Sequence, residues 1–135
     1  MAVGKVQLFT KFKKIMFTKE QVQQFGTISS GTLRSNDIVP RFLQFLENYA
    51  KKRFDDIMSE NLDLAQAYKD CEKKHIYGNI LLIEWNKDNP YWESEECFEM
   101  TDYLIDVICL LCPPGYYFGQ NEGNASDFGF YPYLE

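Results

Sequence analysis

The fold class is decided by residues 113–135, which read PPGYYFGQNEGNASDFGFYPYLE. The opening Pro-Pro-Gly stops any helix that precedes it. Two aromatic runs follow, at 116–119 and 128–131, and aromatic residues favour strands. The stretch between them, 120–127, is polar and is typical of a loop. The segment therefore predicts two antiparallel strands joined by a loop, that is, a C-terminal β-hairpin.

Before this hairpin the sequence predicts about three main helices. The expected helices cover 36–51, 54–72 and 93–111. The first has the clearest signal, because Ser35 or Asn36 can cap it and Pro40 falls in its first turn. Helices followed by a terminal antiparallel hairpin make an α+β fold, a small helical domain that ends in a sheet.

Two shorter stretches carry no clear helical period. Residues 26–32 are small and polar, which is typical of a loop. Residues 79–85 form a short apolar run that fits a buried strand or a helical turn, and we expect helix-like or irregular structure there.

The length of 135 residues fits one domain. We expect a single globular domain over 25–135, preceded by a basic segment, 1–24, that could be an appendage. Within that segment, 6–16 predicts either a short amphipathic helix or an edge strand. No run approaches the roughly 20 apolar residues of a membrane-spanning helix, and no secretory cleavage pattern appears. We expect a cytoplasmic protein without a membrane partner.

Charge is distributed unevenly along the chain. The net charge of −6 combines five lysines and no acid in 1–19, a nearly neutral 20–87, and ten acids without Lys or Arg in 88–135. Ten uncompensated acids create a negative field that attracts basic partners and repels nucleic acid. The sequence therefore favours a basic protein surface as the partner, and no direct contact with nucleic acid.

Four of these acids should project from one side of the third helix. They are Glu95, Glu99, Asp102 and Asp106, at steps of four, three and four residues. The opposite, apolar face is expected to contain Cys97, Phe98, Thr101, Leu104, Ile105, Ile108, Leu111 and Cys112. A solvated helix usually mixes bases with its acids to relieve repulsion. The row is thus either an ordinary solvated face or a surface that docks on a basic partner.

Aromatic residues of the hairpin are a second candidate contact. They could stack on bases, but no Lys or Arg lies near them in the sequence. Core packing or a protein contact is therefore the favoured interpretation, and we add Tyr117 and Asp127 to the predicted partner-binding residues.

The cysteines do not predict a metal centre. Cys109 and Cys112 have a zinc-like local spacing, but their separations from Cys71 and Cys97 match no ligand pattern. Buried cysteine commonly acts as a small apolar side chain. Burial is the favoured interpretation, with metal binding and redox chemistry as alternatives, and we predict no metal and no cofactor.

No catalytic residues are predicted, although two other function classes stay open. The first is a small hydrolase or nucleotide-handling enzyme built around Asp127, His75 and the Ser29–Ser30 loop. Such an enzyme requires these groups to converge within hydrogen-bond reach. The second is a regulatory protein-interaction module that uses the basic N-terminal segment.

Several short motifs at the two ends of 25–135 resemble a known family. They are GTIS at 26–29, GTLR at 31–34, Asp37-Ile38, Pro40, YFG at 117–119 and DFGF at 127–130. The pattern resembles small acidic proteins carried by phages, plasmids and other mobile elements of Gram-positive and gut bacteria. This chain departs from it at 120–125, where QNEGNA replaces the more usual His-Pro-Gly-Asp-Gly. The resemblance implies a mobile-element origin and no established activity.

An acidic, motif-poor protein of this kind suggests a non-catalytic inhibitor of a host defence system that handles nucleic acid. Anti-CRISPR proteins are the nearest analogy, and a CRISPR effector nuclease is a candidate partner. The carboxylate row would occupy Lys and Arg sites that otherwise hold phosphates.

Overall fold

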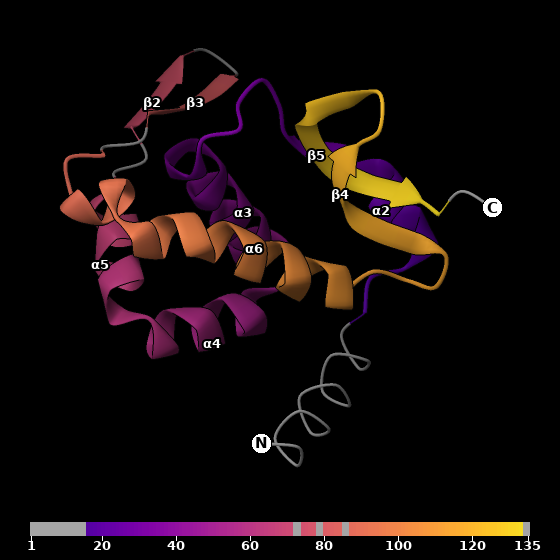
Figure 1. Ribbon diagram of the computed structural model, residues 1–135, viewed down its shortest axis with the longest axis horizontal. Helices are drawn as coiled ribbons and strands as arrows, with labels where there is room; N and C mark the ends of the chain where they lie inside the picture. The colour runs from indigo at the N-terminus through magenta and orange to yellow at the C-terminus, as the bar shows by residue number, and fades with distance from the viewer. Residues whose placement is uncertain (1–15, 72–73, 78–79, 85–86, 134–135) are drawn as a thin grey trace. The chain divides into compact units, whose positions relative to one another are not determined.

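The computed structural model describes residues 16–71, 74–77, 80–84 and 87–133 (Figure 1). Over these residues the protein is α+β, as predicted. The expected helix or edge strand at 6–16 falls almost wholly outside the described residues. The chain divides into two compact units. The hairpin unit comprises residues up to Leu33 and from Asp102 onward, and the helical unit comprises Arg34–Thr101.

The hairpin unit contains helix α2, Lys19–Phe25, and a three-stranded antiparallel sheet. The strands are β1 (Thr27–Ser29), β4 (Tyr116–Asn121) and β5 (Asn124–Pro132), in the order β1-β5-β4. In Figure 1, β4 and β5 lie side by side, and α2 contacts β5. A capping box between Thr18 and Gln21 begins α2.

Part of the expected loop at 26–32 is a strand. Thr27 pairs with Gly129 and Ser29 with Phe128, so β1 adds to the free edge of β5. Gly26 and Gly31 flank β1 with φ values of 62° and 80°. Such positive φ values favour glycine, which explains the glycines at both ends of the strand.

The C-terminal hairpin is confirmed, but its strands are longer than predicted. Only Glu122 and Gly123 separate β4 from β5, whereas 120–127 was expected to be loop. The Asn121 side chain accepts the Gly123 N–H at 2.7 Å, and the Gln120 amide donates to the Ala125 carbonyl at 2.8 Å. These polar residues are therefore strand ends and turn, stabilised by side-chain hydrogen bonds to the backbone.

Phenylalanine side chains form the core of the hairpin unit. Among the described residues, the Phe130 ring contacts those of Phe118, Phe25 and Phe17, with centroid distances of 5.0 Å, 5.5 Å and 6.2 Å. The Phe17 N–H also donates to the Leu111 carbonyl at 2.8 Å. The chain just before α2 is thereby fixed to the segment that follows α6.

The helical unit begins with three helices where two were expected. They are α3 (Ser35–Tyr49), α4 (Lys51–Glu60) and α5 (Leu62–Asp70). The prediction of one continuous helix over 54–72 was wrong, because Asn61 interrupts it with φ −131° and ψ 77°. The Asn61 side-chain amide donates to the Ile57 carbonyl at 2.9 Å, which satisfies one of the last carbonyls of α4.

Within the apolar run at 79–85, the described residues 80–84 form a strand, so the expectation of helix-like or irregular structure was wrong there. Strand β3, Ile80–Glu84, pairs antiparallel with β2, Lys74–Tyr77. An uninterrupted apolar run has no period of its own to select helix or strand. Pairing with β2 decides the outcome. The missed signal in the sequence is Gly78-Asn79 between the two runs, which is typical of a two-residue hairpin turn.

Helix α6, Glu95–Leu110, starts in the helical unit and ends in the hairpin unit. A short 3-10 helix, Pro90–Glu93, precedes α6. Helix α6 therefore begins two residues after the predicted start at residue 93. Ser94 explains the start, because its Oγ accepts the Cys97 N–H at 3.2 Å. Five α-helices are thus described where about three were expected. Phe98 was assigned to the apolar face of this helix, and instead it is 68% exposed.

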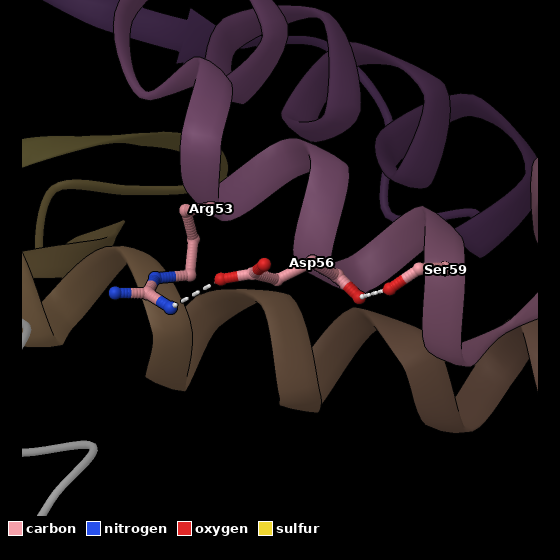
Figure 2. Close-up of polar contacts among 3 residues, drawn as sticks. All are labelled: Arg53, Asp56 and Ser59. Atoms are coloured by element: carbon pink, nitrogen blue, oxygen red, sulfur yellow. Dashed lines mark hydrogen bonds and ion pairs between the residues drawn. The ribbon is translucent and has the colours of Figure 1, made fainter.

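The helical unit buries an apolar stripe of α3 together with one charged side chain. The most completely buried residues of α3 are Ile38, Val39, Phe42, Leu43 and Leu46. Arg53 of α4 is also buried, and its guanidinium lies 3.3 Å from the Asp56 carboxylate (Figure 2). Ser59 donates to the Asp56 carbonyl at 2.8 Å in the same figure. Buried charge is tolerated when it is paired in this way.

Candidate functional site

The four predicted carboxylates of α6 are all exposed. Solvent reaches the side chains of all four residues, Glu95, Glu99, Asp102 and Asp106. Their spacing places successive members about 5–6 Å apart on the helix surface. Within the described part of the chain, none of the four is in an ion pair or a hydrogen bond. The first two belong to the helical unit and the last two to the hairpin unit.

The buried side of α6 explains this orientation. Cys97, Leu104, Ile108 and Leu111 are fully or almost fully buried, and they recur at helical spacing on the face away from the carboxylates. Packing of these apolar residues fixes the rotation of the helix about its axis. Like charges therefore remain side by side in water, where their repulsion lowers helix stability by a few tenths of a kcal/mol per pair.

Tyr117 lies on the face of the β4–β5 sheet opposite the Phe118–Phe130 core. Its ring is 6.0 Å from Tyr131, its partner across the ladder, and 5.3 Å from Tyr133. Partial burial, together with the Glu122 carboxylate and the two neighbouring phenols, raises the pKa of Tyr117. Tyr133 is 63% exposed. The three tyrosines form a partly open aromatic surface, which we call the tyrosine face.

Asp127 is occupied by a contact within the hairpin unit. Its carboxylate accepts a hydrogen bond from Ser30 Oγ at 2.5 Å, which joins β5 to the loop after β1. No local pattern in the sequence indicates this pair, because the two residues are 97 positions apart. Among the described residues, no hydrogen bond joins Tyr117 or Asp127 to Asp102 or Asp106.

The residues of the alternative enzyme site are only partly brought together. Ser30 and Asp127 meet, whereas Ser29 is buried with 3% of its surface exposed. His75 belongs to β2 of the helical unit, and its side chain lies outside the described residues. In a Ser–Asp hydrogen bond alone, the only base beside the hydroxyl is a weakly basic carboxylate.

The helical unit also contains a cavity that the sequence did not predict. Its volume is about 430 Å³, and its lining consists of Glu47, Phe54, Met58, Ala65, Tyr68, Lys69 and Cys71. The Tyr68 hydroxyl donates to Glu47 Oε1 at 2.9 Å. Burial, and secondarily this hydrogen bond, raises the pKa of Tyr68. None of the predicted site residues lines this cavity.

The four cysteines fall into two pairs by position. Cys71 and Cys97 belong to the helical unit, Cys109 and Cys112 to the hairpin unit, and all four are free thiols. Burial raises the pKa of both Cys71 and Cys97 to about 11. No cluster of three or more metal-ligating side chains occurs within the described ranges.

Cys109 makes an unusual contact with β4. Its Sγ accepts the Phe118 N–H at 3.3 Å, and the same thiol donates to the Phe118 carbonyl at 3.0 Å. Both backbone groups of a strand residue point to the same side, so this edge of β4 faces Cys109 rather than β5. The sequence contains no local signal for the contact.

No helix among the described residues is long and apolar enough to cross a bilayer. Comparison of the chain with protein-family models, with curated proteins and with solved structures gives no match.

Proposed function

We propose that this protein is a non-catalytic inhibitor that binds a basic surface of a host nucleic-acid-handling protein, in the manner of anti-CRISPR proteins. The observation that carries the proposal is the carboxylate row of Glu95, Glu99, Asp102 and Asp106. All four are exposed and without ion pairs among the described residues, and no Lys or Arg follows residue 87 in the chain.

The mechanism is competition for positive charge. A groove that binds nucleic acid presents Lys and Arg side chains to the phosphates, and neutralisation of the phosphates releases counterions from the nucleic acid. Carboxylates fixed on a helix neutralise the same side chains and steer the partner by long-range attraction. The tyrosine face, at Tyr117 and Tyr133, supplies the aromatic contact area that anchors most protein interfaces.

The resemblance to mobile-element proteins suggests which partners are relevant. A protein carried by a phage or plasmid acts in the cytoplasm of its host. The basic proteins there that attack the mobile element are nucleases of the defence systems. A CRISPR effector nuclease is the type of partner that fits both the charge and the origin.

The test is capture of host proteins by the immobilised chain at low and high salt, with bound proteins identified by mass spectrometry. The bait is compared with the double variant Asp102→Lys/Asp106→Lys. The control is Glu60→Lys/Asp63→Lys, which makes the same change of charge at two exposed acids of α4 and α5.

We expect the wild-type chain to retain a nucleic-acid-binding protein at low salt and to release it at high salt or when DNA competes. The α6 variant should bind that protein at least about tenfold more weakly, with a smaller salt dependence, while the control variant binds nearly as well as wild type. Equal binding by the two variants would show that net charge, and not the α6 row, determines the interaction.

A further inference from the structure

We infer that Cys109 and Cys112 form a redox-active dithiol, a site of reversible disulfide formation by exchange with a small-molecule disulfide. The inference is independent of the carboxylate row. It rests on the separation of the two cysteines, on their unequal exposure, and on the hydrogen bonds of Cys109 to Phe118.

The backbone already holds the two cysteines at a distance that a disulfide can span. They occupy the first and fourth positions of a turn at the end of α6, closed by a hydrogen bond from Cys112 N–H to the Cys109 carbonyl at 3.1 Å. Such a turn brings its end Cα atoms within about 7 Å, and disulfides take Cα separations of about 4.4–6.8 Å. Side-chain rotation, without a large change in the backbone, is enough for the bond to form.

The two thiols differ in exposure, which assigns their roles. Cys112 is buried, and its Sγ lies 3.6 Å from the Ile108 carbonyl, the acceptor for its thiol. Cys109 is only half-buried. An external disulfide can therefore approach Cys109, while Cys112 is protected and positioned to react second.

The two backbone groups of Phe118 act on Cys109 in opposite directions, because the carbonyl oxygen at 3.0 Å accepts from the thiol and the N–H favours the thiolate. The C-terminal end of a helix disfavours negative charge, but the Phe118 N–H points at Sγ from 3.3 Å and offsets this effect. The neighbouring Cys112 thiol, assisted by that backbone N–H, lowers the pKa of Cys109 to about 7 against the opposing effects of burial and the Asp106 carboxylate. The proximity of Cys109, together with burial, raises the pKa of Cys112.

The reaction consists of two exchanges. The Cys109 thiolate attacks one sulfur of the small disulfide RSSR, forms a protein–S–S–R bond and expels RS⁻, which takes a proton from water. The Cys112 thiol then loses its proton to water and attacks the Cys109 sulfur, so that the Cys109–Cys112 bond forms and the second RS⁻ leaves and is protonated. The protein dithiol is oxidised by two electrons and RSSR is reduced to two RSH.

Oxidation would also change the edge of the hairpin sheet. Disulfide formation removes the thiol hydrogen that Cys109 donates to the Phe118 carbonyl, and rotation of the Cys109 side chain toward Cys112 moves its sulfur away from the Phe118 N–H. Phe118 is 1% exposed, at the centre of the edge strand β4, and both of its backbone groups then lose their contact with Cys109. The redox state of the dithiol is thereby linked to the stability of the C-terminal hairpin.

The experiment incubates the full chain in mixtures of reduced and oxidised glutathione, then quenches with acid and alkylates the remaining thiols. Trypsin cannot separate Cys97 from Cys109, because no Lys or Arg follows residue 87, so a protease that cleaves after Glu and Asp is used. The wild-type chain is compared with Cys109→Ser, Cys112→Ser and the control Cys97→Ser, and circular dichroism confirms that each variant is folded.

We expect wild type and Cys97→Ser to lose two hydrogen atoms in the peptide that contains Cys109 and Cys112, without retaining glutathione. Cys112→Ser should stop at a mixed disulfide on Cys109, and Cys109→Ser should not react over the same range. Amide exchange at Phe118 should be faster in the oxidised wild type and return to its first rate after reduction. Two results would overturn the inference. One is a wild-type chain that stays reduced in fully oxidised glutathione. The other is a Cys109→Ser variant that is oxidised as readily as the wild-type chain.

Discussion

Gly119 and Gly129 lie opposite each other in the β4–β5 ladder, but only Gly119 has room for a side chain. A Cβ at Gly129 would come within 2.8 Å of the Gly26 carbonyl oxygen and 3.3 Å of the Thr27 Cα. A Cβ at Gly119 would meet only the Tyr117 ring, at an ordinary 3.4 Å. At Gly129, therefore, the backbone at the start of β1 lies too close to the central strand β5 to leave room for a Cβ.

This difference predicts unequal effects of two matched substitutions. Gly129→Ala should lower the free energy of unfolding by about 1–3 kcal/mol, because β1 must move away from β5. Gly119→Ala should change it by less than about 0.5 kcal/mol, since reduced freedom of the unfolded chain offsets small adjustments. Urea denaturation of the two variants checks the prediction. Similar losses for both would contradict the close approach of β1.

The contact between Cys109 and the Phe118 backbone predicts a second pair of effects. Cys109→Ala removes the side-chain partner of a buried N–H and a buried carbonyl, and should lower the free energy of unfolding by about 1–2 kcal/mol. Cys109→Ser keeps a hydroxyl that can donate and accept, so its loss should be smaller. Amide hydrogen exchange at Phe118, measured beside urea denaturation, should be fastest in the alanine variant. Equal exchange rates in both variants would argue against the contact.

The buried thiols of the helical unit predict a loss of stability at alkaline pH. The pKa of Cys71 and of Cys97 is raised to about 11 from an ordinary value of 9.0. The contribution of these two thiols to the free energy of unfolding is therefore fully present below pH 9. It is lost as the pH rises through about 11, because the unfolded chain releases thiol protons that the folded chain keeps. Raised pKa values of Tyr68 and Tyr91 act in the same direction at still higher pH.

The measurement is the urea midpoint of unfolding as a function of pH from neutral to about 10.5, a range in which an ordinary thiol titrates. Cys97→Ala should flatten the decline, whatever its effect on absolute stability. A decline of the same steepness in this variant would assign the effect to other groups.

Two ion pairs on α4 predict different costs for similar substitutions. Asp56 pairs with Arg53, whose side chain is 5% exposed, whereas Asp55 pairs with Lys51, whose side chain is 62% exposed. Asp56→Ala removes one contact of a buried charge, and should lower the free energy of unfolding by about 1–3 kcal/mol. Asp55→Ala should cost less than about 0.5 kcal/mol, since exposed pairs contribute little. Thermal or urea unfolding of the two variants measures both values, and a reversed order would contradict the burial of Arg53.

Part of the fold was predictable because its signals are local. The helix near 36–51 follows from its apolar period. The expected start signals were wrong, because α3 begins at Ser35 after Arg34, without a side-chain cap, and Pro40 lies inside the helix rather than in its first turn. The hairpin follows from two aromatic runs around polar residues. The break at Asn61 was missed, because an asparagine within a periodic stretch does not by itself indicate that its side chain will hydrogen-bond to the preceding turn.

The candidate site divides in the same way. Helical spacing alone predicted that the four α6 carboxylates share one side, and their exposure follows from the apolar side chains on the other. The contacts of Asp127 and Cys109 were not predictable, because Ser30 and Phe118 reach them only through the pairing of β1, β5 and β4.

The sequence by itself determined the α+β class, the positions of the strongest helices and the concentration of ten acids after residue 87. These features depend on residues that are close in the sequence, and they need no contact with distant parts of the chain. Only the tertiary structure decided that the apolar run at 80–84 is a strand, that Thr27–Ser29 joins the sheet, and that the Cys109 thiol covers the edge of β4. Strand β1 depends on a partner at the other end of the chain, which no local pattern encodes. The strand at 80–84 pairs with its sequence neighbour β2, and it was missed because an apolar run alone fits helix or strand. The Cys109 contact depends on how the chain folds back after α6.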